Sequence, residues 1–168
     1  MSEIAYLSLG SNLGNREANL AGAITILSDQ VEIENLKSAS FYETEPLHNT
    51  DQPLFLNTVL ELLTSFSPFE LLDKIHETES LLGRPKDREK NSPRVIDIDI
   101  LCYGSAVIET NELTIPHPEL PNRKFVLIPF EELAPRFVVS QLNLSVSDLL
   151  QICNDNTTVV KHIIETNA

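Results

Sequence analysis

The chain has 168 residues, 42% of them hydrophobic, and a formal net charge of −13. This length predicts one domain, over residues 1–168, with a core of ordinary size. The acidic balance argues against nucleic acid as a partner, because a phosphate backbone needs an extended basic surface, and it argues equally against an anionic membrane surface.

The sequence also indicates a cytoplasmic setting. Two cysteines, Cys102 and Cys153, do not make a disulfide framework. The N-terminus lacks the basic and apolar segments of a signal peptide, and no stretch approaches the ~20 apolar residues of a membrane span. We therefore expect a cytoplasmic protein without membrane contact.

Strands and helices alternate along the chain. Apolar runs and turn residues predict, in order, a strand over 4–9, a glycine turn over 10–15, a helix capped by Asn15, a strand over 31–42, a polar loop over 43–53, a strand over 55–63, a helix from the capping box of Ser67 and Glu70 to Gly83, and a strand that carries Asp97 and Asp99. This β-α-β-β-α-β order predicts an α+β fold. Its expected core is a ferredoxin-like βαββαβ unit, with a mainly antiparallel sheet flanked by helices.

A C-terminal extension follows this core. It is predicted to hold a short helix over 129–133, a helix capped by Ser147 that runs to residue 152, and a final strand over 159–164.

The two aspartates are the most informative pair in the sequence. β-branched neighbours favour a strand around them, so Asp97 and Asp99 share one face and lie roughly 7 Å apart. The other face is expected to be wholly apolar, with Ile96, Ile98, Ile100 and Cys102. Two carboxylates at this spacing suit one or two Mg²⁺ ions.

A solvated face of an edge strand is the alternative explanation of the pair. Two like charges beside a core are costly without a cation or basic partners. The flanking residues Val95, Leu101 and Tyr103 make the aspartate face partly apolar. We therefore interpret the pair as lying at the rim of a site.

A basic segment leads into this strand. Residues 84–94 contain five of the 12 basic residues of the chain, against its acidic background. Arginine forks match phosphate geometry, so this segment and the aspartates together would suit a metal–polyphosphate site. A solvated loop, with its charges paired to Asp87 and Glu89, remains an equal alternative for the segment alone.

Three further features each have a structural alternative. The glycine turn lacks the Walker A and dinucleotide-binding patterns and is better explained as a tight turn. His117 stands between two prolines and six residues before Arg123, which suits either a structural role or an anion contact. Phe55 and Phe125 are either core residues or ring-stacking residues.

The sequence resembles the 6-hydroxymethyl-7,8-dihydropterin pyrophosphokinases of folate biosynthesis. The likeness is carried, in the order of that family, by Gly-Ser-Asn-Leu-Gly-Asn at 10–15, Ser-Phe-Tyr-Glu-Thr at 40–44 with Pro46, Gln52, Pro53 and Asn57, Gly-Arg at 83–84 with Pro-Arg-Val-Ile-Asp-Ile-Asp-Ile-Leu at 93–101, and Ile-Pro-His-Pro at 115–118 with Asn-Arg-Lys-Phe at 122–125. It covers about residues 4 to 138.

The resemblance implies transfer of pyrophosphate from ATP to the pterin hydroxymethyl oxygen, with AMP leaving and two Mg²⁺ ions bound. It implies a catalytic set of Arg84, Arg94, Asp97 and Asp99, the two aspartates being the metal ligands. It implies a pterin pocket of Thr44, Leu47, Phe55, Asn57 and Phe125. It implies an ATP site of Glu79, Arg84, Ile100, Thr114, His117 and Arg123. Dihydropteroate synthase is a possible functional neighbour.

Some positions depart from the family, and two other functions stay open. Asn91 stands where bacterial members often have an aromatic, His76 where they often have glutamine, and Phe55 where they often have tyrosine. A non-catalytic pterin- or nucleotide-binding module would keep the pocket without turnover. A sugar-nucleotide transferase could also use an Asp-x-Asp pair, although this chain is short for its nucleotide-sugar domain.

Overall fold

The computed structural model describes residues 1–46, 50–85 and 92–164. Within these residues the helices are α1 (Arg16–Ser28), α2 (Pro68–Leu81), α3 (Lys124–Leu133) and α4 (Val146–Ile152), with a 3-10 helix over Leu120–Asn122. The strands are β1 (Glu3–Ser11), β2 (Ile33–Ser38), β3 (Tyr42–Thr44), β4 (Phe55–Thr64), β5 (Asp97–Tyr103), β6 (Ile108–Glu109), β7 (Thr114–Ile115), β8 (Val138–Val139), β9 (Leu144–Ser145) and β10 (Val159–Lys161). None of the described helices is long and apolar enough to cross a membrane.

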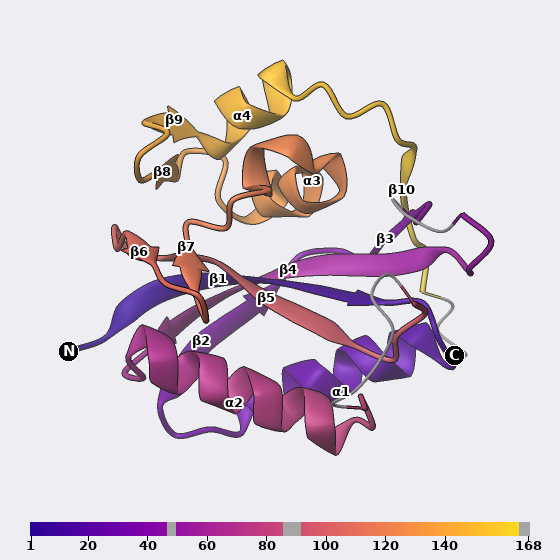
Figure 1. Cartoon of the computed structure of the whole chain (residues 1–168), viewed down its shortest axis with the longest axis horizontal. Helices are drawn as coiled ribbons and strands as arrows, with labels where there is room; N and C mark the ends of the chain where they lie inside the picture. The colour runs from indigo at the N-terminus through magenta and orange to yellow at the C-terminus, as the bar shows by residue number, and fades with distance from the viewer. Residues whose placement is uncertain (47–49, 86–91, 165–168) are drawn as a thin grey trace.

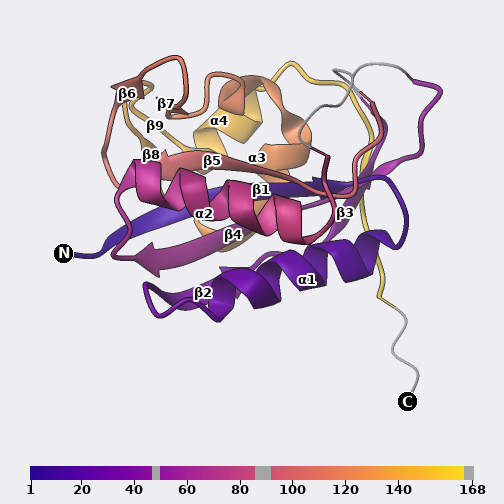
Figure 2. The ribbon, with the colours of Figure 1, turned by 60° about the horizontal axis from the view of Figure 1, so that its bottom comes forward.

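The main sheet is antiparallel and is covered on both faces. Its strand order is β10-β3-β4-β1-β5, and β2 pairs with β4 beside β3. Helices α1 and α2 cover one face, and α3 and α4 cover the other (Figures 1 and 2). The predicted combination of helices with a mainly antiparallel sheet is confirmed.

Each face of the sheet has its own buried cluster. The cluster on the side of α1 and α2 includes Leu7, Leu20 and Ile75. The cluster on the side of α3 and α4 is centred on Tyr6 and Phe130, whose rings are 4.6 Å apart. A pocket lies over one end of the sheet, where β1, β4 and β5 meet the start of α3.

The capping signals in the first half of the chain are confirmed. The Asn15 side chain accepts a hydrogen bond from the Ala18 amide at the start of α1. Ser67 and Glu70 form the expected capping box at the start of α2. These caps satisfy amides that an isolated helix leaves unpaired, so they set where each helix begins.

The glycine turn begins later than predicted. Gly10 lies inside β1, and Gly14 is the residue of this segment with positive φ, at +73°. A Cβ on Gly10 would stand 2.9 Å from the Asn57 side-chain oxygen. Gly10 is therefore explained by the close approach of β4, and Gly14 by the conformation of the turn.

The single strand predicted over 31–42 is wrong, because the chain breaks between β2 and β3. Ser38 lies opposite Leu60 and Tyr42 lies opposite Asn57, so the outer chain carries one residue more than β4 over this stretch. The Ala39 carbonyl at the break accepts hydrogen bonds from the hydroxyls of Ser38 and Thr58. This bulge lets one outer segment follow both halves of a long, twisted strand.

The predicted faces of β5 are correct up to Ile100 and wrong beyond it. Tyr6 pairs with Cys102 while Leu7 pairs with Ile100, so Leu101 is an extra residue in β5. The bulge reverses the alternation, and Cys102 joins the cluster around Tyr6 while Tyr103 joins the opposite one. The expectation that Cys102 shares the face of Ile100, and that Tyr103 shares the face of the aspartates, is therefore corrected.

The C-terminal half also differs in detail. Helix α3 begins at Lys124, five residues before its internal Pro129. The cap of α4 is Ser145, whose hydroxyl accepts from the Asp148 amide, in place of the predicted Ser147. The final strand, β10, is three residues long and pairs with β3.

Candidate active site

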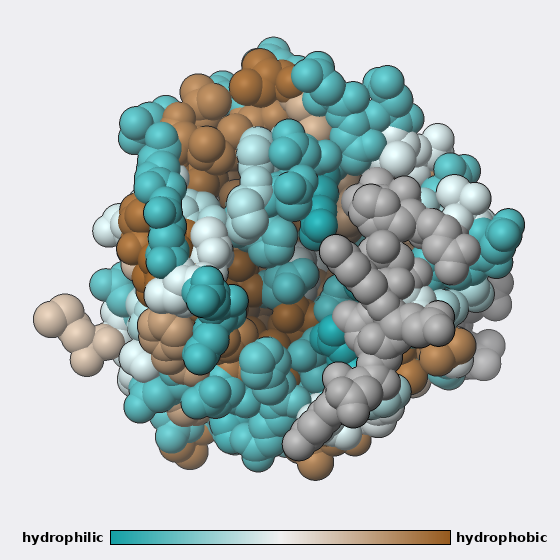
Figure 3. Space-filling model, in the orientation of Figure 1, coloured by the Kyte–Doolittle hydropathy of each residue, from teal (hydrophilic) through white to brown (hydrophobic). Residues whose placement is uncertain are grey.

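Two pockets meet at the aspartate pair of β5. The first has a volume of about 590 Å³ and lies between β1, β4, β5 and the first turn of α3; the second, of about 350 Å³, lies between α2, β5 and the segment that follows β7. Asp97 and Asp99 are the residues that line both. A hollow over β5 with a hydrophilic rim is visible on the surface in Figure 3.

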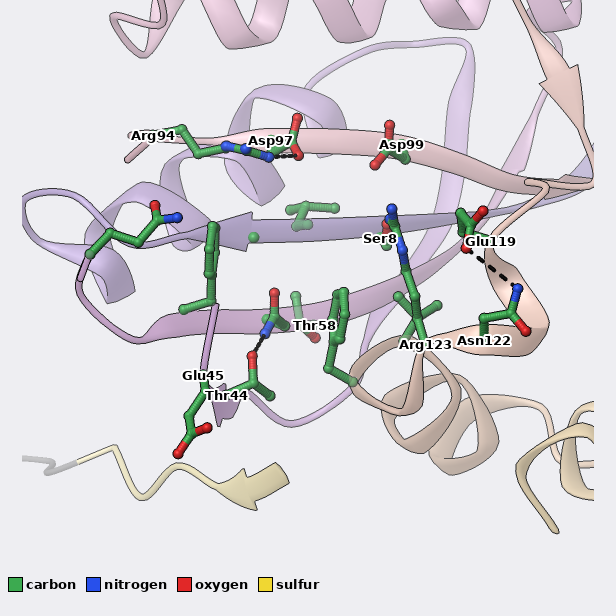
Figure 4. Close-up of a pocket in the computed structure, with 17 residues that line it drawn as sticks. Ser8, Thr44, Glu45, Thr58, Arg94, Asp97, Asp99, Glu119, Asn122 and Arg123 are labelled. Carbon is green, nitrogen blue, oxygen red and sulfur yellow. Dashed lines mark hydrogen bonds and ion pairs between the residues drawn. The ribbon is translucent and has the colours of Figure 1, made fainter. Parts of the chain in front are cut away.

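Asp97 is held between two arginines. The Arg84 Nη1 atom donates to one carboxylate oxygen at 3.0 Å, and the Arg94 Nη1 atom donates to the other at 2.8 Å. The second of these contacts is drawn in Figure 4. The two ends of the basic segment therefore converge on one carboxylate, with guanidinium groups beside the place where the pockets join.

The negative charge of Asp99 is less well stabilised than that of Asp97. Burial and the neighbouring charge of Asp97 raise its pKa from 3.8 to about 6, against the opposing charges of the arginines, Arg123 first. Among the described residues none donates a hydrogen bond to its side chain. Arg123 extends toward it from the start of α3 (Figure 4). A half-buried carboxylate that accepts no hydrogen bond from the described residues is suited to an incoming cation.

Glu79 connects α2 to the start of β5. Its carboxylate accepts a hydrogen bond from the Ile98 amide at 3.0 Å and pairs with Arg84. Burial raises the pKa of Glu79 to about 7, although the charge of Arg84 and the Ile98 amide act in the opposite direction. Glu79 therefore holds Arg84 from one side while Asp97 holds it from the other.

His117 is neutral at physiological pH. Burial and the charge of Arg123 lower its pKa to about 4. The Glu119 amide donates to the Nδ1 atom of His117 at 3.1 Å, so Nδ1 is the acceptor and Nε2 carries the proton. The backbone amide of His117 donates to the Leu101 carbonyl at 2.9 Å. The ring is thus fixed as a donor in the second pocket.

The first pocket has aromatic walls and an amide on its floor. Phe55 and Phe125 line it, and the Arg94 guanidinium carbon lies 5.6 Å from the centre of the Phe55 ring. The Asn57 amide donates to the Thr44 hydroxyl at 2.7 Å, which fixes its orientation and leaves its oxygen as an acceptor beside Gly10. Such a pocket suits a flat, polar-edged ring.

The structure brings together the predicted residues that it describes. Thr44, Phe55, Asn57, Arg94, Arg123 and Phe125 line the first pocket, Glu79, Arg84, Ile100, Thr114 and His117 line the second, and Asp97 and Asp99 line both. His76 lies in the second pocket as well. Leu47 and Asn91 lie outside the described residues, as do Asp87 and Glu89, so the expectations about them stay predictions.

Sequence reasoning gave no role to Asn12, which proves central. Asn12 is 1% exposed. Its amide donates to the Gln52 side chain at 2.8 Å and to the Pro53 carbonyl, and its oxygen accepts from the Arg94 amide at 2.8 Å. Its position in the Gly-Ser-Asn-Leu-Gly segment could have pointed to it. Its role was not predictable, because its partners lie 40 and 82 residues away.

Comparison with known proteins identifies the family. The sequence model of 7,8-dihydro-6-hydroxymethylpterin-pyrophosphokinase (HPPK) matches residues 6–135. The chain belongs to this family. It is similar to the 2-amino-4-hydroxy-6-hydroxymethyldihydropteridine pyrophosphokinase of Bacillus subtilis, with 42% identity over 133 residues that cover 79% of each chain. The corresponding protein of Methylorubrum extorquens is 41% identical over 135 residues, 80% of this chain and 85% of its own.

The fold is also found in solved structures. A chain of Plasmodium falciparum HPPK-DHPS, crystallised with pteroate, matches with a TM-score of 0.72 and 16% identity, over 90% of this chain. The match spans 42% of that longer chain. At this identity the likeness concerns the fold alone.

The carboxylate pair fits a magnesium ion bound together with phosphates. Among the described residues, no group of three or more His, Cys, Asp and Glu side chains could hold a metal ion. Mg²⁺ is commonly held by one or two carboxylates, with water and substrate phosphates completing its octahedron. The donor set of this pyrophosphokinase, two aspartates beside an arginine-rich wall, is of that kind.

Proposed function

We propose that the chain transfers pyrophosphate from ATP to the hydroxymethyl oxygen of 6-hydroxymethyl-7,8-dihydropterin and releases AMP, in folate biosynthesis. The observation that carries this proposal is the junction of the two pockets. An acceptor ring in the first pocket and a nucleotide in the second would meet beside Asp97 and Asp99. Group transfer between them then depends mainly on positioning and on charge neutralisation.

The pterin would lie between Phe55 and Phe125 in the first pocket. Stacking on two aromatic faces suits a fused heteroaromatic ring. The fixed amide oxygen of Asn57 would accept a hydrogen bond from the polar edge of the ring, with the Thr44 hydroxyl holding that amide in place. Leu47, which lies outside the described residues, is proposed for the same pocket.

ATP would occupy the second pocket and extend toward the first. Glu79, Ile100 and Thr114 would form the nucleotide side of the pocket. The neutral His117 ring would donate from Nε2 to a phosphate oxygen, and Arg123 would contact the phosphates from the other side of the aspartates. Arg84 and Arg94 would stabilise the negative charge of the transferring group.

Asp97 and Asp99 would hold two Mg²⁺ ions, which neutralise phosphate charge and align the group that is transferred. Asp97, as a ligand of the cations, would no longer carry the full pairing of both arginines. Asp99, to which none of the described residues donates a hydrogen bond, would gain a partner in the same way. The arginines could then turn toward the phosphates without leaving an unpaired buried charge.

Three broader proposals follow from family membership. The strands β1, β4 and β5, with β2 and β3 counted as one interrupted strand, would form a split βαβ, ferredoxin-like core together with α1 and α2. The protein would work in the cytoplasm. Dihydropteroate synthase would be its functional neighbour, which agrees with the joint name HPPK-DHPS of the Plasmodium protein.

Formation of AMP tests the proposed reaction. The protein is incubated with ATP, Mg²⁺ and 6-hydroxymethyl-7,8-dihydropterin, and nucleotides are separated by chromatography. We expect AMP that depends on all three components, and no turnover with ATP alone. Pterin and nucleotide binding without AMP would instead identify a non-catalytic binding module, and ADP as the product would identify a different transfer.

A further inference from the structure

The C-terminal extension crosses the molecule next to the first pocket. After α4, residues 153–162 run in an extended path along the side of the fold, past α3 and β3 to α1 (Figure 1). We call this segment the C-terminal strap. Its residues alternate between half-buried and exposed from 153 to 160. It lies wholly beyond residue 135, where the match to the family model ends.

The first anchor of the strap is Asp155. One carboxylate oxygen accepts a hydrogen bond from the Lys124 amide at 2.9 Å, and the other accepts from the Thr157 amide at 2.9 Å. Lys124 is the first residue of α3, between Arg123 and Phe125. Arg123 makes no side-chain cap there, so the strap supplies the capping acceptor that the helix itself lacks.

The second anchor is the edge of the sheet. Strand β10 pairs with β3 so that Val159 lies opposite Thr44 and Lys161 opposite Tyr42. The His162 amide donates to the Phe41 carbonyl at 2.8 Å, and the His162 ring lies 2.5 Å from the Glu17 carboxylate of α1. Since Thr44 holds the Asn57 amide, this anchor supports the floor of the first pocket.

The opposite end of α3 is fixed by a different group. Glu132 accepts hydrogen bonds from the Ser40 amide at 2.7 Å and from the Tyr42 hydroxyl at 2.6 Å. The last turn of α3 is therefore tied to Ser40 and to Tyr42 of β3, which itself pairs with Lys161 of the strap. The first turn, which carries Phe125, is instead tied to the strap through Asp155. Removing Asp155 would release the Phe125 end and leave the Glu132 end in place.

We propose that the strap is a positioning device for the pterin pocket, with Asp155 as the positioning residue that holds Phe125 and β10 as the support of Thr44. This inference rests on the proposed function, because it assigns the aromatic wall to the pterin. It gives the extension a role in specificity that is separate from the chemistry at the aspartates.

Amide hydrogen exchange on the unmodified protein directly tests the hydrogen bond between the Lys124 amide and Asp155. We expect the Lys124 amide to exchange slowly and the Phe125 amide, which has no acceptor among the described residues, to exchange fast. In Asp155→Ala the Lys124 amide should become as fast as that of Phe125. Equally fast exchange of both amides in the parent protein would overturn the proposal, whatever ligand the pocket takes.

Calorimetry tests the consequence for binding. The probes are 6-hydroxymethylpterin and, separately, α,β-methylene ATP with Mg²⁺, whose α–β bridge cannot be cleaved by the transfer. For Asp155→Ala we expect pterin affinity to fall about tenfold and nucleotide affinity to change less than about threefold. Asp155→Asn keeps one acceptor oxygen and should recover part of the loss.

Ser145→Ala is the matched control, because it removes a comparable cap from α4 in the same extension. It should leave pterin affinity unchanged. The proposal is overturned if folded Asp155→Ala binds pterin within twofold of the parent, or if both ligands weaken equally. If the parent protein itself fails to bind the pterin, the proposed function fails. Amide exchange then still decides whether Asp155 holds the Lys124 amide.

Discussion

Replacing Asp99 with asparagine should stabilise the protein in the absence of metal. The folded-state pKa of Asp99 is raised from 3.8 to about 6. The unfolded chain therefore releases this proton at lower pH than the folded protein, and stability falls as pH rises from about 4 to about 6. The rise in pKa corresponds to roughly 3 kcal/mol of unfavourable free energy above pH 7.

The asparagine amide keeps the size of the side chain but removes the charge. The cost of burying the amide offsets part of the gain in stability. We therefore expect the free energy of unfolding of Asp99→Asn at pH 7.5 to be roughly 1–2 kcal/mol higher than that of the parent, and its melting temperature to be about 2–8 °C higher. The difference from the parent should vanish near pH 3.5, where both side chains are neutral.

Asp97→Asn is the internal contrast, because Asp97 is paired with Arg84 and Arg94. These pairs are partly exposed, so their loss should lower stability by about 1 kcal/mol or less. The assay is chemical denaturation in EDTA from pH 3.5 to 8. A metal-free Asp99→Asn protein that gains no stability at pH 7.5, or gains equally at every pH, would refute the description of Asp99 as a half-buried, charged side chain to which no described residue donates a hydrogen bond.

Three further predictions concern the pockets. Phe55→Ala should weaken pterin binding by roughly 1–3 kcal/mol by calorimetry, by analogy with base stacking, whereas Phe69→Ala on the exposed side of α2 should not; equal affinities would place the ring elsewhere. Arg94→Ala should lower kcat much more than ATP affinity, while Lys74→Ala changes neither, and normal kcat with weak ATP binding would contradict the transition-state role. Because the pKa of His117 is lowered to about 4, ATP affinity should show no titration of this ring between pH 6 and 8, and a loss of affinity above pH 6.5 that His117→Gln removes would show that the ring is charged.

Features that depend on neighbouring residues could be predicted from the sequence. The Asn15 cap and the capping box of Ser67 involve partners three residues away. The alternation that places Asp97 and Asp99 together depends on the local period of a strand. The basic segment that leads directly into β5 indicated that cationic side chains lie near the aspartates, although the pairing of Arg84 and Arg94 with Asp97 was not predicted.

Features that depend on residues far apart in the chain could not be predicted from the sequence. The bulge at Leu101 arises from how β5 matches β1, and it moved Cys102 and Tyr103 to faces that alternation does not predict. Asn12 connects segments that meet only in the folded chain. The final strand was predicted over 159–164, but its pairing with β3 was not, because β3 lies more than 100 residues earlier in the chain.

The product of a single turnover tests the central claim most directly. With enzyme in excess over pterin, and ATP and Mg²⁺ present, mass spectrometry should find the pterin carrying two additional phosphates, together with one equivalent of AMP. Asp99→Asn at saturating Mg²⁺ should form almost none of this product while remaining folded. A pterin with one added phosphate and an equivalent of ADP, or full product formation by Asp99→Asn, would contradict pyrophosphoryl transfer at this carboxylate pair.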